Sequence, residues 1–174
     1  MEDLFQEIEK GLSVGLYHMA LGLTLCIPDM CAALQSENGQ TTGKKYRNWY
    51  RENFTDDQNL LSAEDCYSFR CSFLHQGTTQ ENGSRYARIV FAEPGPMTMH
   101  NNVFINKVKK GNELIEERVL NIDIEIFCTI MINSASRWIQ KVKDTEVFKR
   151  NSEKAFSKYP EGLSPYIVGV PVYS

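Results

Sequence analysis

Residues 12–34 read LSVGLYHMALGLTLCIPDMCAAL and form the most apolar stretch of this 174-residue chain. The stretch contains His18, Pro28 and Asp29 as well as two glycines, and Lys10 is the only basic residue close to it. A transmembrane helix needs about 20 consecutive, predominantly apolar residues. The stretch therefore predicts a buried core helix that breaks near Pro28, and it argues against a membrane span.

Two consecutive helices are predicted around this stretch. Apolar side chains recur over residues 2–25, mostly three or four positions apart, at Leu4, Phe5, Ile8, Leu12, Leu16, Met19 and Leu23. This spacing places them on one face of a helix. Pro28 suits the first turn of a second helix that runs to about Gln35. Residues 36–40 (SENGQ) then predict a turn.

Residues 42–54 predict a short amphipathic helix. One side of it is aromatic, with Tyr46, Trp49, Tyr50 and Phe54. The remaining surface is basic, with Lys44, Lys45, Arg47 and Arg51. Such a pattern is typical of a helix that buries one face. The basic side is interpreted as a solvated face, and contact of Lys44, Arg47 and Arg51 with RNA is the alternative.

A further helix is predicted to begin at Ser62 and end at Gly77. Ser62 followed three residues later by Asp65 resembles a capping box, in which the two side chains satisfy free amides at the helix start. Glycine is favoured just past a helix C-terminus. Residues 78–84 predict a polar loop.

The pattern changes after residue 84. Three strands are predicted at 85–91, 103–108 and 114–122, with Lys110-Gly111-Asn112 as a hairpin turn between the last two. Asp123 then caps a long helix to about Lys143, and a short helix follows at roughly 144–157. The tail over 158–174 is predicted to be irregular, with its apolar Tyr166-Ile167-Val168 segment packed on the body.

This order of elements predicts a mainly α protein of one domain over residues 1–174. We expect an antiparallel helical bundle with a small antiparallel β-sheet inserted at about 85–122. The first and last long helices are expected to pack together, because neither can bury its apolar stripe alone. His18 is interpreted as a packed core histidine.

Composition narrows the classes of function. The net charge of −3 argues against a broad basic nucleic-acid surface, although not against a local one. Five cysteines, with an acidic start at Met1-Glu2-Asp3, predict reduced thiols in a cytoplasmic protein. Cysteine pairs at zinc-knuckle spacing are absent from the sequence, so no metal and no cofactor is expected.

The candidate site is the segment Arg70-Cys71-Ser72-Phe73-Leu74-His75. Arg70 supplies a permanent cation with a fork of donors that fits phosphate. His75 can accept or donate a proton near neutral pH. Residues five apart on a straight helix lie about 140° apart around its axis, so the two do not share one face. A symmetric partner helix could close the site across a dyad.

Residues 67–77 (YSFRCSFLHQG) resemble the signature helix of HEPN-domain proteins, in which Arg and His are separated by four to six residues. The aromatic segment Tyr46-Arg47-Asn48-Trp49-Tyr50 resembles a second part of the pattern in HEPN-like bacterial proteins. The resemblance is specific over about 42–77. It implies a HEPN-like helical bundle that forms a homodimer through the 62–77 helix.

The resemblance also implies metal-independent RNA cleavage by a toxin or phage-defence effector, in some cases paired with an antitoxin-like protein. Arg70 would bind the scissile phosphate and His75 would transfer a proton, with Cys71 and Ser72 in support. Active relatives commonly carry a polar residue where this chain has Cys71. Three alternatives stay open: a ribonuclease, a non-catalytic module that binds nucleotide, RNA or protein, and a structural homodimer.

Overall fold

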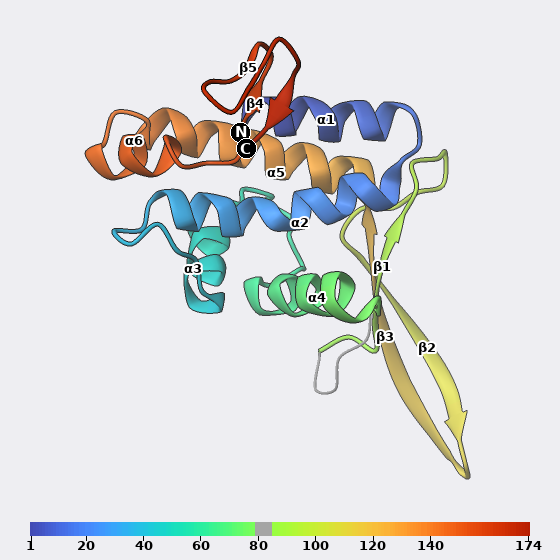
Figure 1. Ribbon diagram of the computed structural model, residues 1–174. Helices are drawn as coiled ribbons and strands as arrows, with labels where there is room; N and C mark the ends of the chain where they lie inside the picture. The colour runs from blue at the N-terminus through green and yellow to red at the C-terminus, as the bar shows by residue number, and fades with distance from the viewer. Residues whose placement is uncertain (79–84) are drawn as a thin grey trace.

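The computed structural model describes residues 1–78 and 85–174, and within these the chain forms a mainly α protein with small β-sheets (Figure 1). The helices are α1 Glu2–Ser13, α2 Tyr17–Leu34, α3 Gly43–Asn53, α4 Ala63–Gln76, α5 Ile124–Val142 and α6 Glu146–Ser152. The predicted class, helices around a β insertion, is therefore confirmed. Most of the predicted loop at 78–84 lies outside the described residues.

The inserted sheet is mixed, which corrects the prediction of an antiparallel sheet. Its strands are β1 Arg88–Ala92, β2 Asn102–Lys110 and β3 Glu113–Asp123, in the order β1-β3-β2. The hairpin of β2 and β3 is antiparallel, as predicted, but β1 pairs parallel to β3. Ala92 and Asn102 both lie opposite the last residues of β3, so the connection from β1 to β2 passes the end of β3.

The first break between helices falls at Gly15 and not near Pro28, so the prediction of one helix over 2–25 is wrong. The Gly15 amide bonds to the Leu12 carbonyl at 3.1 Å, and the Leu16 amide bonds to the Gly11 carbonyl at 2.8 Å. This pair of bonds forms a Schellman motif, which needs a left-handed residue. Gly15 has a φ of +75°, a conformation that glycine adopts without a steric penalty.

Helix α2 continues through Pro28 instead of ending there. Proline has no amide hydrogen to bond the carbonyl four residues earlier, so it weakens a helix interior. Pro28 is fully buried, and half of the α2 residues are buried with it. Apolar burial along the helix outweighs the loss of one hydrogen bond, so tertiary packing sets this helix length rather than local propensity.

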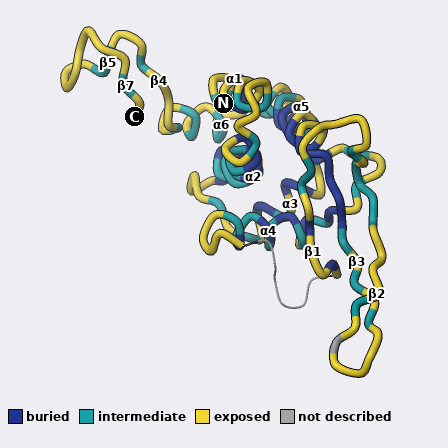
Figure 2. Tube along the Cα trace, turned by 90° about the vertical axis from the view of Figure 1, so that its right-hand side faces the viewer, coloured by how far each residue is buried: buried dark blue, intermediate teal, exposed yellow. Residues whose placement is uncertain are grey.

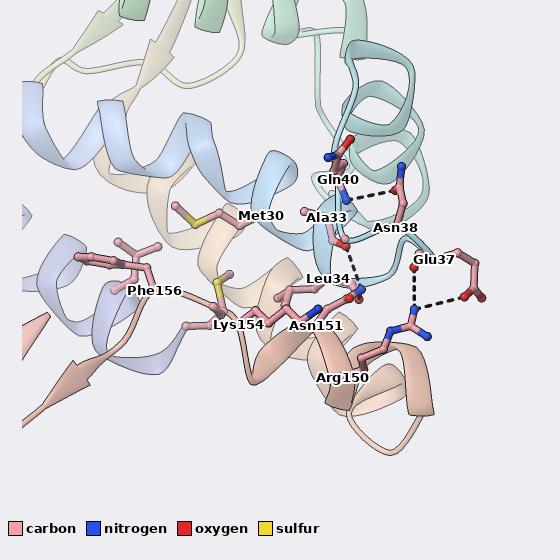
Figure 3. A pocket seen from close by; sticks show the side chains of 14 residues that line it. Met30, Ala33, Leu34, Glu37, Asn38, Gln40, Arg150, Asn151, Lys154 and Phe156 are labelled. Atoms are coloured by element: carbon pink, nitrogen blue, oxygen red, sulfur yellow. Dashed lines mark hydrogen bonds and ion pairs between the residues drawn. The ribbon is translucent and has the colours of Figure 1, made fainter. Parts of the chain in front are cut away.

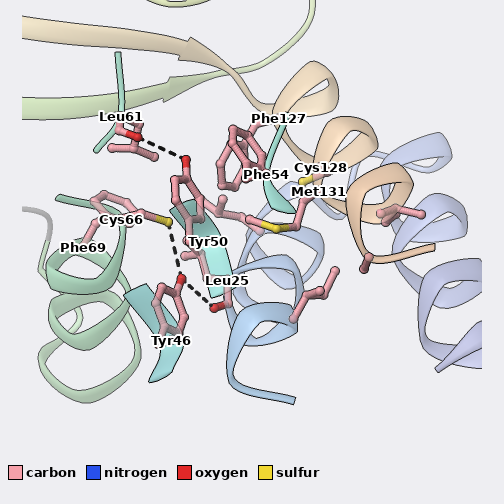
Figure 4. Packing of buried hydrophobic residues seen from close by; sticks show 14 of the residues in the cluster. Leu25, Tyr46, Tyr50, Phe54, Leu61, Cys66, Phe69, Phe127, Cys128 and Met131 are labelled. Atoms are coloured by element: carbon pink, nitrogen blue, oxygen red, sulfur yellow. Dashed lines mark hydrogen bonds between the residues drawn. The ribbon is translucent and has the colours of Figure 1, made fainter. Parts of the chain in front are cut away.

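The core forms around α2, which α1, α3, α4 and α5 all contact (Figure 4). The buried Tyr46 hydroxyl donates to the Leu25 carbonyl at 3.1 Å and lies 3.4 Å from the Cys66 Sγ, so it links α3 to α2 and α4. Trp49 and Trp138 are both buried, and their rings meet edge to face at 5.9 Å. The first two helices and the long helix α5 therefore share one core, as predicted.

The sheet packs on the bundle only at its base. Ile89, Leu120 and Ile122 are buried, and the Phe91 ring lies 5.0 Å from Phe69 and 5.2 Å from Phe127. The far half of the β2–β3 hairpin projects away from the helices and is exposed (Figure 2). The base therefore covers one edge of the bundle, while the hairpin tip is free of it.

Among the described helices, α2 is long and apolar enough to span a membrane by length and composition. Its 18 residues have a mean hydropathy of 1.3, and half of them are buried inside the protein. A buried core helix passes the same test. The expectation that the chain has no membrane span stays a prediction.

The C-terminal tail differs from prediction in two ways. It is not irregular, because it forms the short strands β4 Lys158–Tyr159, β5 Gly162–Leu163, β6 Ile167–Val168 and β7 Val172–Tyr173. Strand β4 pairs with β7 and β5 pairs with β6. The segment 166–168 does not pack on the body, because all three of its residues are exposed.

We predict opposite effects for two alanine substitutions in the same helix end. Gly15→Ala places a β-carbon on a left-handed residue and should lower the free energy of unfolding by about 1 kcal/mol. Gly11→Ala lies inside α1, where an added Cβ would be no closer than 3.7 Å to its neighbours. It should raise that free energy by roughly 0.5–1 kcal/mol.

Urea denaturation of the two variants and the parent protein measures both values. A stabilising Gly15→Ala would contradict the Schellman motif, since alanine cannot occupy that conformation without strain.

Candidate functional site

The candidate site lies where one stripe of α2 meets α4. His18, Gly22, Cys26 and Asp29 follow each other at three- or four-residue spacing and so share one face of α2. The His18 ring lies 4.8 Å from the Phe73 ring. A Cβ at Gly22 would lie 3.3 Å from Phe73, so glycine permits the close approach of the helices. His18 is nevertheless exposed, so its prediction as a core histidine is wrong.

Arg70 contacts both a carboxylate and the candidate histidine. Its Nη2 lies 2.8 Å from the Asp29 Oδ2, and its Nη1 lies 3.2 Å from the His75 Nε2. The Arg70 side chain is 20% exposed and that of Asp29 is 13% exposed, whereas His75 lies on the surface. Arg70 and His75 do not share a face of α4, but the long arginine side chain brings its guanidinium to the imidazole.

The contact with Arg70 assigns a role to one ring nitrogen of His75. A guanidinium can only donate hydrogen bonds, so the His75 Nε2 is the acceptor in this contact. The tautomer that fits the contact carries its proton on Nδ1. A neutral imidazole of this kind can take a proton from a hydroxyl group once Arg70 turns away.

Burial and charge act in opposite directions on the Arg70–Asp29 pair. Burial raises the pKa of Asp29 above its ordinary value, although Arg70 and a hydrogen bond from the Thr41 hydroxyl pull it down. Burial also disfavours the Arg70 cation, but Asp29 and the nearby thiols outweigh this effect and the pKa of Arg70 is raised. Arg70 therefore stays charged, while loss of solvation makes the ionised form of Asp29 less favourable.

The other predicted site residues are divided between the surface and the core. The Cys71 Sγ lies 4.0 Å from the Arg70 Nη1 and is partly exposed. Ser72 is 1% exposed and lies on the buried side of α4, where its carbonyl accepts from the Thr78 amide at 3.2 Å. Cys71 is thus next to the Arg70–His75 pair, and Ser72 is not open to solvent.

Of the basic residues on α3, Arg47 is the one that the structure ties to the site. Its guanidinium lies 5.0 Å from the centre of the Tyr67 ring, one helical turn before Arg70 and Cys71. Arg51 instead pairs with Glu64 at the start of α4. Glu64 and His75 are separated by about 16 Å along the helix at 1.5 Å per residue. Lys44 is exposed, with no contact to Arg70 or His75.

The cysteines are free thiols throughout the described chain, as predicted. Cys31, Cys66 and Cys128 are buried. Burial raises the pKa of the Cys66 thiol to about 12 and that of Cys128 to about 11. Thiols in this state are inert as nucleophiles. Residues 1–78 and 85–174 hold no group of three or more His, Cys, Asp and Glu side chains arranged for a metal ion.

A second polar cluster was not visible in the sequence. The His100 Nε2 lies 3.0 Å from the Asp56 Oδ2, and the Asn101 amide group also donates to that oxygen. Asn101 has a φ of +52°, a left-handed conformation that asparagine tolerates better than most residues. These contacts fasten the loop before β2 to the segment between α3 and α4. Asp56 and His100 are 44 positions apart in the sequence, so no local sequence pattern could reveal their contact.

No family model matches the sequence, and neither the curated proteins nor the solved structures provide a match. The resemblance to HEPN proteins therefore rests on the motif in α4 and on the aromatic segment in α3. The chemistry of the site depends on Arg70, His75 and their neighbours.

We predict that Asp29 makes the free energy of unfolding fall as the pH rises, whereas a paired carboxylate usually makes it rise. Its pKa is raised from 3.8 in the folded protein, so its contribution to stability is present below pH 3.8. That contribution is lost as the pH rises through the folded pKa, because the native state then loses a proton it held more tightly. The free energy of unfolding of Asp29→Asn, relative to the parent, should therefore increase with pH across this window.

Urea denaturation from pH 3.5 to 7 measures the difference. Asp144→Asn is the matched control, because it makes the same change at an exposed carboxylate. A difference for Asp29→Asn that falls as the pH rises would mean that attraction to Arg70 outweighs burial.

Proposed function

We propose that this chain is a HEPN-type RNA-binding protein that cleaves RNA without a metal ion. The observation that carries the proposal is the pairing of the Arg70 guanidinium with the His75 imidazole, 3.2 Å apart at the exposed end of α4. A cation with a fork of donors next to a neutral proton acceptor is a minimal arrangement for attack at a phosphodiester.

The proposed reaction uses these two groups in sequence. A phosphate oxygen takes the place of the His75 Nε2 as the acceptor of the Arg70 Nη1 donor. The freed Nε2 then accepts the proton of the neighbouring ribose 2′-hydroxyl, and the 2′-oxygen attacks the phosphorus to form a 2′,3′-cyclic phosphate. The P–O5′ bond breaks, and the 5′-oxygen leaves as a hydroxyl group after taking a proton from water. The guanidinium stabilises the negative charge that develops on the phosphate oxygens. Arg47 of α3, which packs on the Tyr67 ring one turn before Arg70, would contact an adjacent phosphate.

A homodimer through the 62–77 helix belongs to the same proposal. Leu74 and His75 are both exposed on α4, so a second copy of the helix could contact this end. The two Arg70–His75 pairs would then face one cleft, which suits an RNA strand with phosphates at regular spacing. The biological context, a toxin or defence effector with or without an antitoxin-like partner, follows from the resemblance alone.

We predict that purified protein cleaves single-stranded RNA in the presence of EDTA. His75→Ala should lower the cleavage rate by about 10²–10⁴-fold, the usual range for a general acid or base. Arg70→Ala should lower it by about 10²–10³-fold, the usual loss when a donor that stabilises developing charge is removed. Single-turnover cleavage of a fluorescent RNA with a mixed sequence measures the rate. Arg118→Ala, which removes an exposed arginine from β3, should leave it unchanged.

Intact RNA after long incubation with folded parent protein would exclude catalysis. Equal losses in Arg118→Ala and Arg70→Ala would point to general charge loss rather than to a reaction at this site.

The ion pair between Arg70 and Asp29 favours a second function, a module that binds RNA without cleaving it. A carboxylate 2.8 Å from the Nη2 of Arg70 competes with phosphate for the same donor. Cys71 weakens the case for turnover further, because a thiol is a poorer hydrogen-bonding group than the polar residues of active relatives. On this reading the chain binds an RNA backbone through Arg70 and Arg47 and releases it unchanged.

We predict that Asp29→Asn binds single-stranded RNA several-fold more tightly than the parent protein, because the competing carboxylate is gone. Binding should weaken steeply with salt in both proteins. Fluorescence anisotropy at two salt concentrations measures the affinity. Asp57→Asn, an exposed carboxylate with the same change of charge, is the control and should bind like the parent. Equal tightening by both variants would assign the effect to net charge and not to Arg70.

A further inference from the structure

The reaction proposed for Arg70 and His75 contains a second proton transfer, because the 5′-oxygen leaves as a hydroxyl group. In an in-line displacement the attacking and leaving oxygens lie on opposite sides of the phosphorus. A side chain that gives a proton to the 5′-oxygen must therefore face His75 from the other side of the phosphate that Arg70 binds. This requirement rests on the proposed function.

Tyr67, Cys71 and His75 form a stripe on one side of α4. They follow each other at four-residue spacing, which stacks side chains along a helix. The Arg70 Nη1 lies 3.2 Å from the His75 Nε2 and 4.0 Å from the Cys71 Sγ, so the guanidinium reaches over the middle of the stripe. At 1.5 Å per residue, Tyr67 and His75 are separated by about 12 Å along α4. The two residues thus flank the cation from opposite ends.

The Tyr67 hydroxyl belongs to the same cluster. A hydrogen bond with the Cys71 thiol and burial raise the pKa of Tyr67 above its ordinary value, although the charge of Arg70 acts in the other direction. The hydroxyl therefore keeps its proton at neutral pH, as a general acid must. Tyr67 is only partly buried, whereas the hydroxyl of Tyr46 lies in the core and donates to the Leu25 carbonyl.

Helix α3 fixes the position of the Tyr67 ring. The Arg47 guanidinium lies 5.0 Å from the centre of this ring, and the Tyr46 ring lies 5.1 Å from it. A Cβ at Gly43 would lie 2.6 Å from both the Cζ and the Oη of Tyr67, so glycine lets the start of α3 pack against the hydroxyl end. A proton donor that is already held in place loses little freedom when the substrate arrives.

We propose that Tyr67 is the proton donor for the leaving 5′-oxygen. As the 2′-oxygen attacks and the P–O5′ bond breaks, the Tyr67 O–H bond also breaks and its proton goes to the 5′-oxygen. Water then returns a proton to the tyrosinate, and His75 releases to water the proton that it took from the 2′-hydroxyl. Both side chains regain their starting states, and Tyr67 takes the place of water as the immediate donor in the proposed reaction.

Replacement of the leaving oxygen tests this assignment. The substrate is a DNA oligonucleotide with one ribonucleotide, at the base that the parent cleaves fastest, and with either oxygen or sulfur at the scissile 5′ position. A thiolate leaves without a proton. On the oxygen substrate, Tyr67→Phe should lower the single-turnover rate by about 10²–10⁴-fold, the usual effect of a general acid. On the sulfur substrate it should cleave within a few-fold of the parent rate, whereas His75→Ala stays slow on both.

Tyr166→Phe is the matched control, because it removes a hydroxyl from a side chain that is 81% exposed in the tail. It should cleave both substrates at the parent rate. Tyr67→Phe keeps the ring that Arg47 covers, and far-UV circular dichroism checks that each variant is folded.

A parent-like rate of Tyr67→Phe on the oxygen substrate would overturn the assignment and leave the proposed function standing. An equal loss on both substrates would also overturn it, because Tyr67 would then position the site without donating a proton. Rescue of Cys71→Ala by sulfur, with no rescue of Tyr67→Phe, would assign the proton to the thiol instead. Failure of the parent protein to cleave either substrate would remove the proposed function and this assignment together.

Discussion

The burial of α2 is the constraint on which the rest of the structure depends. This helix is apolar on nearly every side, and a helix of that kind must be surrounded. Helices α1, α3, α4 and α5 all pack against it, and its burial holds Pro28 inside a continuous helix. The same burial draws Asp29 into a poorly solvated position. The ion pair with Arg70 follows from this, because a buried carboxylate needs a compensating cation.

Arg70 therefore has a structural role, as the partner of Asp29, and a proposed chemical role beside His75. Its Nη2 compensates Asp29, while its Nη1 reaches His75 at the surface. An arginine can serve both because its donors form a fork, whereas a lysine would be a single point charge. Burial disfavours the ionised form of Asp29. This carboxylate therefore competes less strongly with an incoming phosphate for the donors of Arg70 than an exposed one would.

Local patterns in the sequence were enough to predict the elements, but not the contacts between them. The capping residues Ser62 and Asp123 and the hairpin turn at Gly111 depend on neighbours within four residues, and all three were predicted correctly. The helix break was predicted near Pro28, but burial of α2 keeps the helix continuous through this proline. The break occurs instead at Gly15, where a glycine adopts the left-handed conformation that ends α1. The parallel pairing of β1 with β3 depends on a connection that periodicity does not encode. The partner of Arg70 lies on another helix, and only the structure identifies it as Asp29.

The exposed tail departs from the rule that apolar side chains are covered. Its apolar 166–168 segment was expected to pack on the body because apolar side chains are usually covered. A groove lies beside Phe156 at the start of the tail (Figure 3), but the hydrogen bonds between Ser157 and Ser174 close the tail on itself and leave the 166–168 segment exposed. Short strand pairs satisfy backbone hydrogen bonds locally, and they do so here without covering the apolar side chains that the strands carry. The apolar pattern of the tail therefore predicted the strands' side chains but not where they lie, because hydrogen bonding within the tail and packing on the body are separate requirements.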